Sequence, residues 1–204
     1  MSTLRMMQQI AFHPYDFFEN IQEAGRIKWS QGIVLILLVF VARMVAILLT
    51  SFIFQTREPF EISAFHEFIW IIVPWISFCI SNWAVSTILN GEGKFKELLI
   101  GSAFTLVPYI FMIIPIALLS QLLSFNEKGI YSFLTITTFL WIGWLLLLGL
   151  KILHDFEIGK LIWITLITIV GILIIWFVVI LMYALMNQFY NFFADIVKEL
   201  RMRA

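Results

Sequence analysis

The stretch IVLILLVFVARMVAILLTSFIF, residues 33–54, decides the fold class of this chain. It is long enough to cross a hydrocarbon core of about 30 Å as an α-helix, which takes about 20 apolar residues. Its one charge, Arg43, lies near the middle. A guanidinium at that depth costs roughly 3 kcal/mol on insertion scales, so it normally faces a protein interior, a wet cavity or a partner. Arg43 is therefore the first candidate functional residue.

Four further apolar stretches accompany this one. The chain is 62% hydrophobic and only 13% charged, whereas soluble domains carry about 25% charged residues. The predicted spans are 32–54, 67–90, 98–124, 130–150 and 161–187. In lipid every backbone polar group needs an internal partner, so long segments joined by short polar loops predict helices rather than a barrel. We expect an all-α integral membrane bundle of five transmembrane helices.

Lysine and arginine predict the orientation of the bundle. With the N-terminus in the cytoplasm, the basic residues before the tail divide between cytoplasmic segments (Arg5, Arg26, Lys28, Lys94, Lys96, Lys151, Lys160) and outer loops (Arg57, Lys128). This is the positive-inside distribution of a multi-pass protein of the cell membrane. An odd number of spans then sends the basic C-terminal tail outside, unless the fifth span is bent.

The two ends of the chain are amphipathic. In residues 1–30, Phe17, Phe18 and Ile21 recur at helical spacing, which predicts a cytoplasmic helix lying on the membrane surface. Residues 31–187 form the membrane domain. In the tail, 188–204, one apolar stripe holds Phe189, Phe193, Ile196 and Leu200. A helix continuous with the fifth span would reach about 60 Å, so the tail must bend onto the membrane or project, and we expect it to contact lipid or a protein partner.

Three prolines interrupt the predicted spans. Pro74 lies in the second, and Pro108 and Pro115 both lie in the third. Each removes a helical hydrogen bond, and such kinks are common in membrane helices because neighbours repair the backbone. The alternative is that the third helix, broken twice, lines a groove or forms a hinge.

The partner of Arg43 is the central question for the site. No Asp or Glu lies deep in any predicted span, which indicates that Arg43 has no carboxylate of its own chain at its level. Counted from the cytoplasmic face, Arg43 lies about 16 Å deep, and Ser81 and Asn82 lie about 11 to 12 Å deep on the second span. We therefore expect contacts with Ser81 and Asn82. A lipid phosphate, a substrate anion or an acidic residue of another subunit are the alternatives.

Motifs of ordinary enzymes and of nucleic-acid binding are missing. The sequence has no HExxH, no GxxxxGK[ST], no GxSxG and no pair of intramembrane carboxylates, so we expect no enzyme, no catalytic residue and no cofactor. His154 and Asp155 lack the spaced ligand set of a metal site, so none is expected. A net charge of +0 without a basic cluster argues against a nucleic-acid partner.

Three segments together resemble the Yip-domain family of Ypt-interacting-protein-like membrane proteins. They are HPYDFFENI (13–21), NGEGKFKELLIGSAFTLVPYI (90–110) and LWIGWLLLLGLKILHDFEIGK (140–160). The resemblance implies a five-helix membrane domain with a cytoplasmic N-terminus. Eukaryotic relatives bind Rab-type GTPases through a long N-terminal region that this chain lacks. It therefore resembles the compact bacterial branch, and a GTPase partner is not expected.

Two functions fit these observations. The first is a non-enzymatic membrane scaffold or accessory subunit of a larger membrane complex, which binds other membrane protein subunits, lipid or both. The alternative is a component for small-solute or lipid transport, with a path past Arg43 and the proline-kinked third helix. A water-accessible lumen would distinguish the two.

Overall fold

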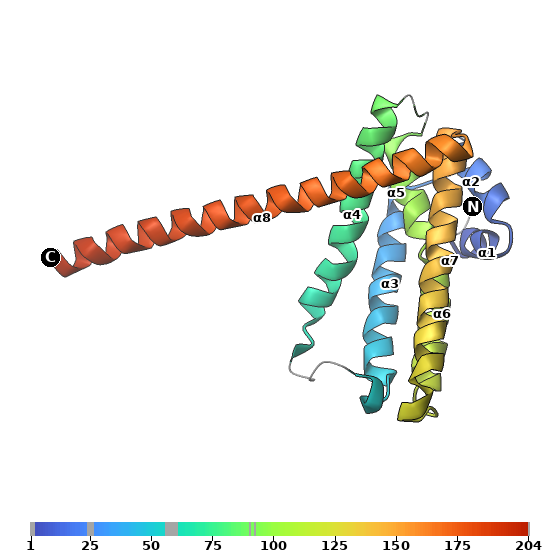
Figure 1. The fold of residues 1–204 in the computed structure, drawn as a ribbon, viewed down its shortest axis with the longest axis horizontal. Coiled ribbons are helices and arrows are strands. Elements are labelled where there is room, and N and C mark those ends of the chain that lie inside the picture. The colour runs from blue at the N-terminus through green and yellow to red at the C-terminus, as the bar shows by residue number, and fades with distance from the viewer. Residues whose placement is uncertain (1–2, 24–26, 56–60, 90, 92, 204) are drawn as a thin grey trace.

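The fold is helical throughout the part that the computed structural model describes, residues 3–23, 27–55, 61–89, 91 and 93–203. Its helices are α1 (Thr3–Phe12), α2 (Pro14–Ile21), α3 (Trp29–Leu49), α4 (Ala64–Ile88), α5 (Phe95–Phe104), α6 (Val107–Leu119), α7 (Lys128–His154) and α8 (Ile158–Arg203) (Figure 1). The described parts of the connections include the short 3-10 turns η1 (Phe52–Phe54) and η3 (Phe125–Glu127).

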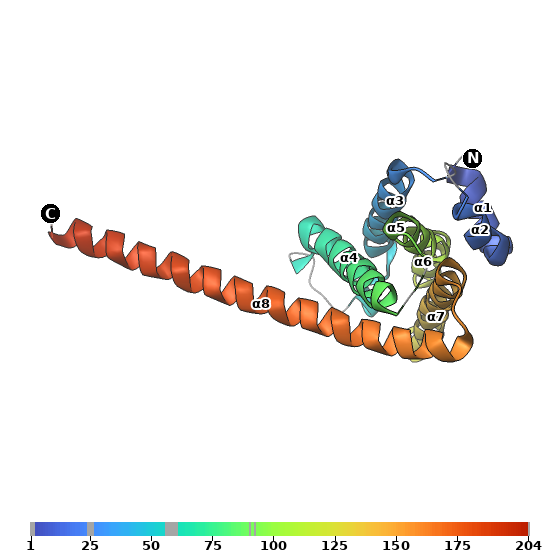
Figure 2. The same ribbon diagram turned by 90° about the horizontal axis from the view of Figure 1, so that it is seen from above.

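Within the described residues, five helical segments are long and apolar enough to cross a membrane, as the sequence predicts. They are Trp29–Leu49, Ala64–Ile88, Phe95–Leu119, Phe125–His154 and Ile158–Ile196. Figure 1 shows α3, α4, α6 and α7 running side by side, and Figure 2 shows them end-on as one group. The all-α membrane fold is confirmed.

The third segment is broken once. It consists of α5 and α6, and the helix is interrupted between Phe104 and Val107, just before Pro108. Pro108 has no N–H and lies in the first turn of α6, a position where a helix tolerates proline. Pro115 lies inside α6 and Pro74 inside α4, and neither ends its helix. Of the two expected breaks in this segment, the structure shows the one at Pro108.

The N-terminal helices belong to the protein core. Phe17, Phe18 and Ile21 of α2 are at most 1% exposed, and the Phe17 ring lies 4.9 Å from that of Phe104 in α5. In α7, Gly149 makes room for the Phe18 ring, because an added Cβ there would lie 2.7 Å from it. The amphipathic pattern of α2 is therefore present. Its apolar face packs against helices of the bundle, where the sequence alone suggested lipid headgroups.

The last helix leaves the bundle. After α7, Asp155 adopts a left-handed conformation (φ 50°), which asparagine and aspartate tolerate, and the chain turns sharply. α8 then runs 46 residues without interruption, about 69 Å at 1.5 Å per residue. Figures 1 and 2 show it crossing α4 at a steep angle and extending far beyond the other helices. Within the described residues α8 is one continuous helix as far as Arg203, and whether the tail lies on the membrane or projects from it stays a prediction.

Candidate functional site

Arg43, the first candidate functional residue, has a carboxylate partner within its own chain. Arg43 in α3 donates through Nε to Glu67 Oε2 at 3.0 Å. The Glu67 side chain is 4% exposed and that of Arg43 is 34% exposed. Glu67 lies in the first turn of α4, where the helix dipole stabilises a negative charge.

The expectation that Arg43 lacks a carboxylate of its own chain is therefore wrong, and the reason is geometric. Arg43 lies six residues before the end of α3 at Leu49, and Glu67 lies three residues after the start of α4 at Ala64. Measured from their shared connection, the two levels are about 9 and about 5 Å deep. The side chain of Arg43 covers that difference. Depth counted from the predicted cytoplasmic face, which is the far end of both helices, does not reveal that the two residues lie close together.

Arg43 and Glu67 lie at the edge of a large apolar cavity. It holds about 770 Å³ and is lined by residues of α3 to α7, among them Trp70, Pro74 and Leu146. Tyr109 of α6 also lines this cavity.

A second cavity of about 160 Å³ shares Arg43 and is lined by more polar groups. These include Thr50, Gln55 and Tyr131, which lie at or near the α3–α4 connection and the start of α7. Arg43 thus separates a polar space at one end of the bundle from an apolar space inside it.

The three prolines differ in whether they line the larger cavity. Pro74 lines it, whereas Pro108 and Pro115 are not among the residues that do. Pro108 is buried in α6 and Pro115 lies on its exposed side. Tyr109, one residue after Pro108, lines the cavity together with Arg43.

Ser81 and Asn82 contact α8 and not Arg43. Ser81 Oγ donates to the Thr168 carbonyl at 2.8 Å, and Asn82 Nδ2 donates to Thr168 Oγ1 at 3.2 Å. The same two helices make a further contact, in which Trp176 Nε1 of α8 donates to Ser77 Oγ of α4 at 3.0 Å. The expected contact of Arg43 with Ser81 and Asn82 is therefore wrong, because these polar groups join α4 to α8.

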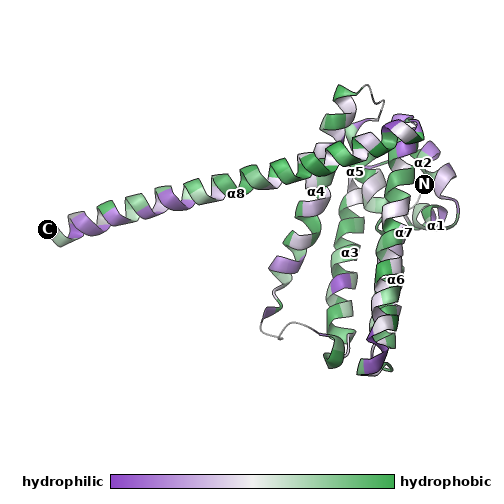
Figure 3. Ribbon diagram, in the orientation of Figure 1, coloured by the Kyte–Doolittle hydropathy of each residue, from purple (hydrophilic) through white to green (hydrophobic). Residues whose placement is uncertain are grey.

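The predicted stripe of the tail lies on the projecting part of α8. Phe189 and Phe193 are 58% and 57% exposed, their rings are 5.9 Å apart, and Ile196 is also exposed. Leu200 lies in the same helix, and its side chain is outside the described set. Figure 3 shows α8 strongly hydrophobic beside the bundle and mixed toward its C-terminal end.

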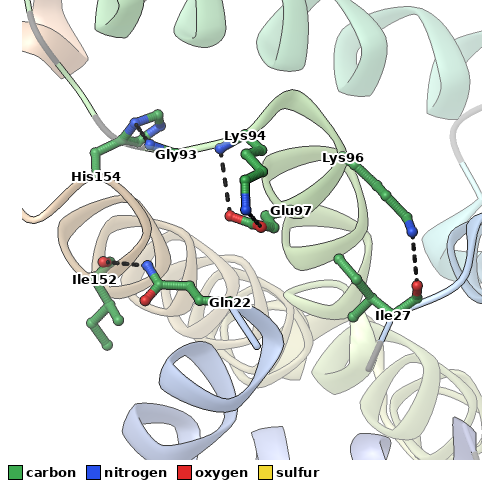
Figure 4. Close-up of polar contacts among 8 residues, drawn as sticks. All are labelled: Gln22, Ile27, Gly93, Lys94, Lys96, Glu97, Ile152 and His154. Atoms are coloured by element: carbon green, nitrogen blue, oxygen red, sulfur yellow. Dashed lines mark hydrogen bonds and ion pairs between the residues drawn. The ribbon is translucent and has the colours of Figure 1, made fainter. Parts of the chain in front are cut away.

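Polar contacts join the helices at the end of the bundle that lies away from the α3–α4 connection. In Figure 4, Gln22 Nε2 donates to the Ile152 carbonyl at 2.9 Å, and Lys96 Nζ donates to the Ile27 carbonyl at 2.9 Å. His154 Nδ1 accepts the backbone N–H of Gly93 at 3.2 Å. These bonds join the N-terminal segment, α5 and α7.

The same end carries much of the positive charge that predicted the cytoplasmic face. Lys94 precedes α5, Lys96 lies in the first turn of α5 and Lys151 lies in the last turn of α7, and Lys94 Nζ also pairs with Glu97 at 3.3 Å. Arg26 and Arg57, which the orientation also used, lie outside the described residues.

The helices and their apolar surfaces define a multi-pass helical membrane protein. The model of the Yip1 domain matches residues 8–190, which is most of the chain. This protein therefore belongs to the Yip1 domain family, as the three sequence segments indicated. Comparisons with curated proteins and with solved structures found no match.

Proposed function

We propose that this protein is a non-enzymatic accessory subunit of a membrane complex, in which α8 binds another membrane protein. The observation that carries this proposal is the uncovered surface of α8. Only the first part of the helix packs on its own chain, where Leu161, Ile164 and Thr168 are buried. Beyond Trp176, the apolar side chains of the described helix are exposed, including Phe189 and Phe193.

The length and composition of α8 support a protein partner. The helix is 46 residues long and extends far beyond the other helices (Figure 1), so its C-terminal part lies away from its own chain. Its C-terminal part combines an aromatic stripe with nearly balanced charges, among them Asp195, Lys198 and Arg201. Balanced charge gives little attraction to anionic lipid, whereas amphipathic helices commonly lay their apolar face into a groove of a partner.

Exchange of two aromatic residues tests this function. The variant Phe189→Ser/Phe193→Ser removes the stripe, and Asn191→Ser/Asp195→Ser is its matched control on the polar side of the same two turns. Assemblies extracted gently from native membranes are compared by native electrophoresis. We expect the first variant to shift from the large assembly to the isolated chain, while the control keeps the size of the parent. An unchanged assembly in both variants would contradict the proposal.

The transport alternative draws support from the two cavities that meet at Arg43. A path would have to continue toward the end of the bundle where α2 lies. The space there, lined by Phe18, Phe78 and Gly149, holds about 10 Å³, which is about one water molecule at most. A solute would therefore have to displace Phe18. Proteoliposomes with Phe18→Ala that remain impermeable to small solutes would count against transport.

A further inference from the structure

We infer that the cavity beside Arg43 binds one hydrocarbon chain of an amphiphile whose acidic group, a phosphate or a carboxylate, pairs with the Arg43 guanidinium. This site is separate from the surface of α8 that carries the proposed function.

The first observation is the size and chemistry of the cavity. Its volume of about 770 Å³ falls within the range of about 300 to 1,000 Å³ that is typical of small-molecule sites. Aromatic and aliphatic side chains line most of it, including Trp75, Phe78 and Leu146. Each buried methylene contributes about 0.8 kcal/mol, so a hydrocarbon chain is the ligand part that this lining favours.

The second observation is the state of the guanidinium. A guanidinium has five N–H donors in a fixed plane. Glu67 accepts a hydrogen bond from Nε, and Tyr109 lines the same cavity. The Arg43 side chain is nevertheless about one third exposed, and this exposed part faces cavities. A guanidinium binds phosphate or carboxylate oxygens in a bidentate manner, which gives the exposed edge a matching ligand.

The third observation is that polar and apolar spaces adjoin at this residue. The smaller cavity, lined by Thr50, Gln55 and Tyr131, offers hydroxyl and amide groups to a headgroup. The larger cavity accepts the chain. An inorganic anion would use Arg43 and leave the apolar volume unfilled, whereas an ester or alcohol without an acidic group would fill the volume and leave Arg43 unused.

A partner helix fits the larger cavity less well than a hydrocarbon chain. A helix with side chains is about 10 to 12 Å wide. The nearby helix of this chain, α8, lies against α4 at a different space of about 240 Å³, which Trp176 and Val179 help to line. A protein segment found in the larger cavity would overturn the inference.

Binding of three probes to the full-length protein in a non-ionic detergent tests the site. The probes are oleoyl lysophosphatidic acid, methyl oleate and inorganic phosphate, followed by native mass spectrometry and titration calorimetry. We expect saturable binding of the lysophosphatidic acid at one copy per chain, and at least about tenfold weaker binding of the other two. Equal binding of inorganic phosphate would show that Arg43 binds a free anion without need of a hydrocarbon chain, and would overturn the inference. Equal binding of methyl oleate would show that Arg43 does not recognise an acidic group.

Two variants separate recognition from folding. Arg43→Gln/Glu67→Gln removes both charges together, so no single charge is left buried, and Leu146→Trp reduces the apolar space. We expect each to weaken lysophosphatidic acid binding about tenfold or more. Leu147→Trp, one position on and outside the cavity lining, is the matched control and keeps the parent affinity. Parent affinity in both test variants, with parent melting temperatures, would overturn the inference.

Discussion

Arg43 and Glu67 lie 3.0 Å apart, and this pair joins α3 to α4 close to the connection between them. The pair accounts for the one charge within residues 33–54. Because the Glu67 side chain is almost fully buried while that of Arg43 is partly exposed, loss of Arg43 removes a charge partner from a buried carboxylate.

Single and double substitutions should measure how much the interaction between Arg43 and Glu67 contributes to stability. Arg43→Leu should destabilise the protein by about 2 kcal/mol, less than the roughly 3 to 5 kcal/mol of a fully buried pair because Arg43 is partly exposed. Arg43→Leu/Glu67→Leu should recover most of that loss, since both charges of the pair are removed together. Thermal unfolding in detergent, analysed as a double-mutant cycle, measures this coupling. Equal destabilisation by the single and the double variant would show that Glu67 does not depend on Arg43.

The contact between α4 and α8 depends on a glycine. A Cβ at Gly171 would collide with Ser81 Oγ, the group that donates to Thr168. Gly171→Ala should therefore cost about 1 to 3 kcal/mol in packing, more than the roughly 1 kcal/mol that alanine gains in helix propensity. Gly159→Ala, in the same helix with open space around it, should be neutral or stabilising. Unfolding temperatures of the two variants decide the matter, and a stabilised Gly171→Ala would place α8 elsewhere.

The N-terminal helices should behave as part of the core. In α7, Gly149→Ala pushes on the Phe18 ring, whereas Gly143→Ala meets nothing within 4 Å. We expect the first to expose α2 to limited proteolysis and the second to leave it protected. If both variants were cut at the rate of the parent protein, the packing of α2 on α7 would not hold in the membrane.

The positive-inside distribution predicts that Lys94 and Lys151 lie in the cytoplasm and Lys128 on the other side. The fold is compatible with this prediction, because the α4–α5 and α7–α8 connections lie at one end of the bundle and η3 at the other (Figure 1). In a Cys79→Ala background, Lys94→Cys and Lys128→Cys should react with an impermeant maleimide from opposite faces of sealed vesicles. Labelling of both from one face would refute the prediction.

The sequence predicts the helical segments well because each depends on local composition. Long apolar runs identify the five spans, and the helical spacing of Phe17, Phe18 and Ile21 identifies the amphipathic α2. A pattern of this kind does not reveal which surface covers the apolar face, so the contact of Phe18 with Gly149 emerges only from the structure.

The site was predictable in part. The importance of Arg43 followed from the cost of burying its charge, but its partner depended on the level of each residue relative to the shared connection. Glu67 lies at the edge of its span, where the sequence indicates a polar boundary. Counting from the end that both helices share would have pointed to it. The roles of Ser81 and Asn82 required the path of α8, which no local pattern specifies.

The central claim, that the projecting part of α8 binds another membrane protein, is tested most directly by photocrosslinking in the native membrane. A photoreactive phenylalanine at Phe193 is compared with one at Phe133, which is exposed on α7. We predict that position 193 gives a discrete adduct with a different protein, that Phe189→Ser removes it, and that position 133 yields only lipid adducts. Lipid adducts alone at position 193, or an adduct with the mass of two copies of this chain, would contradict the claim.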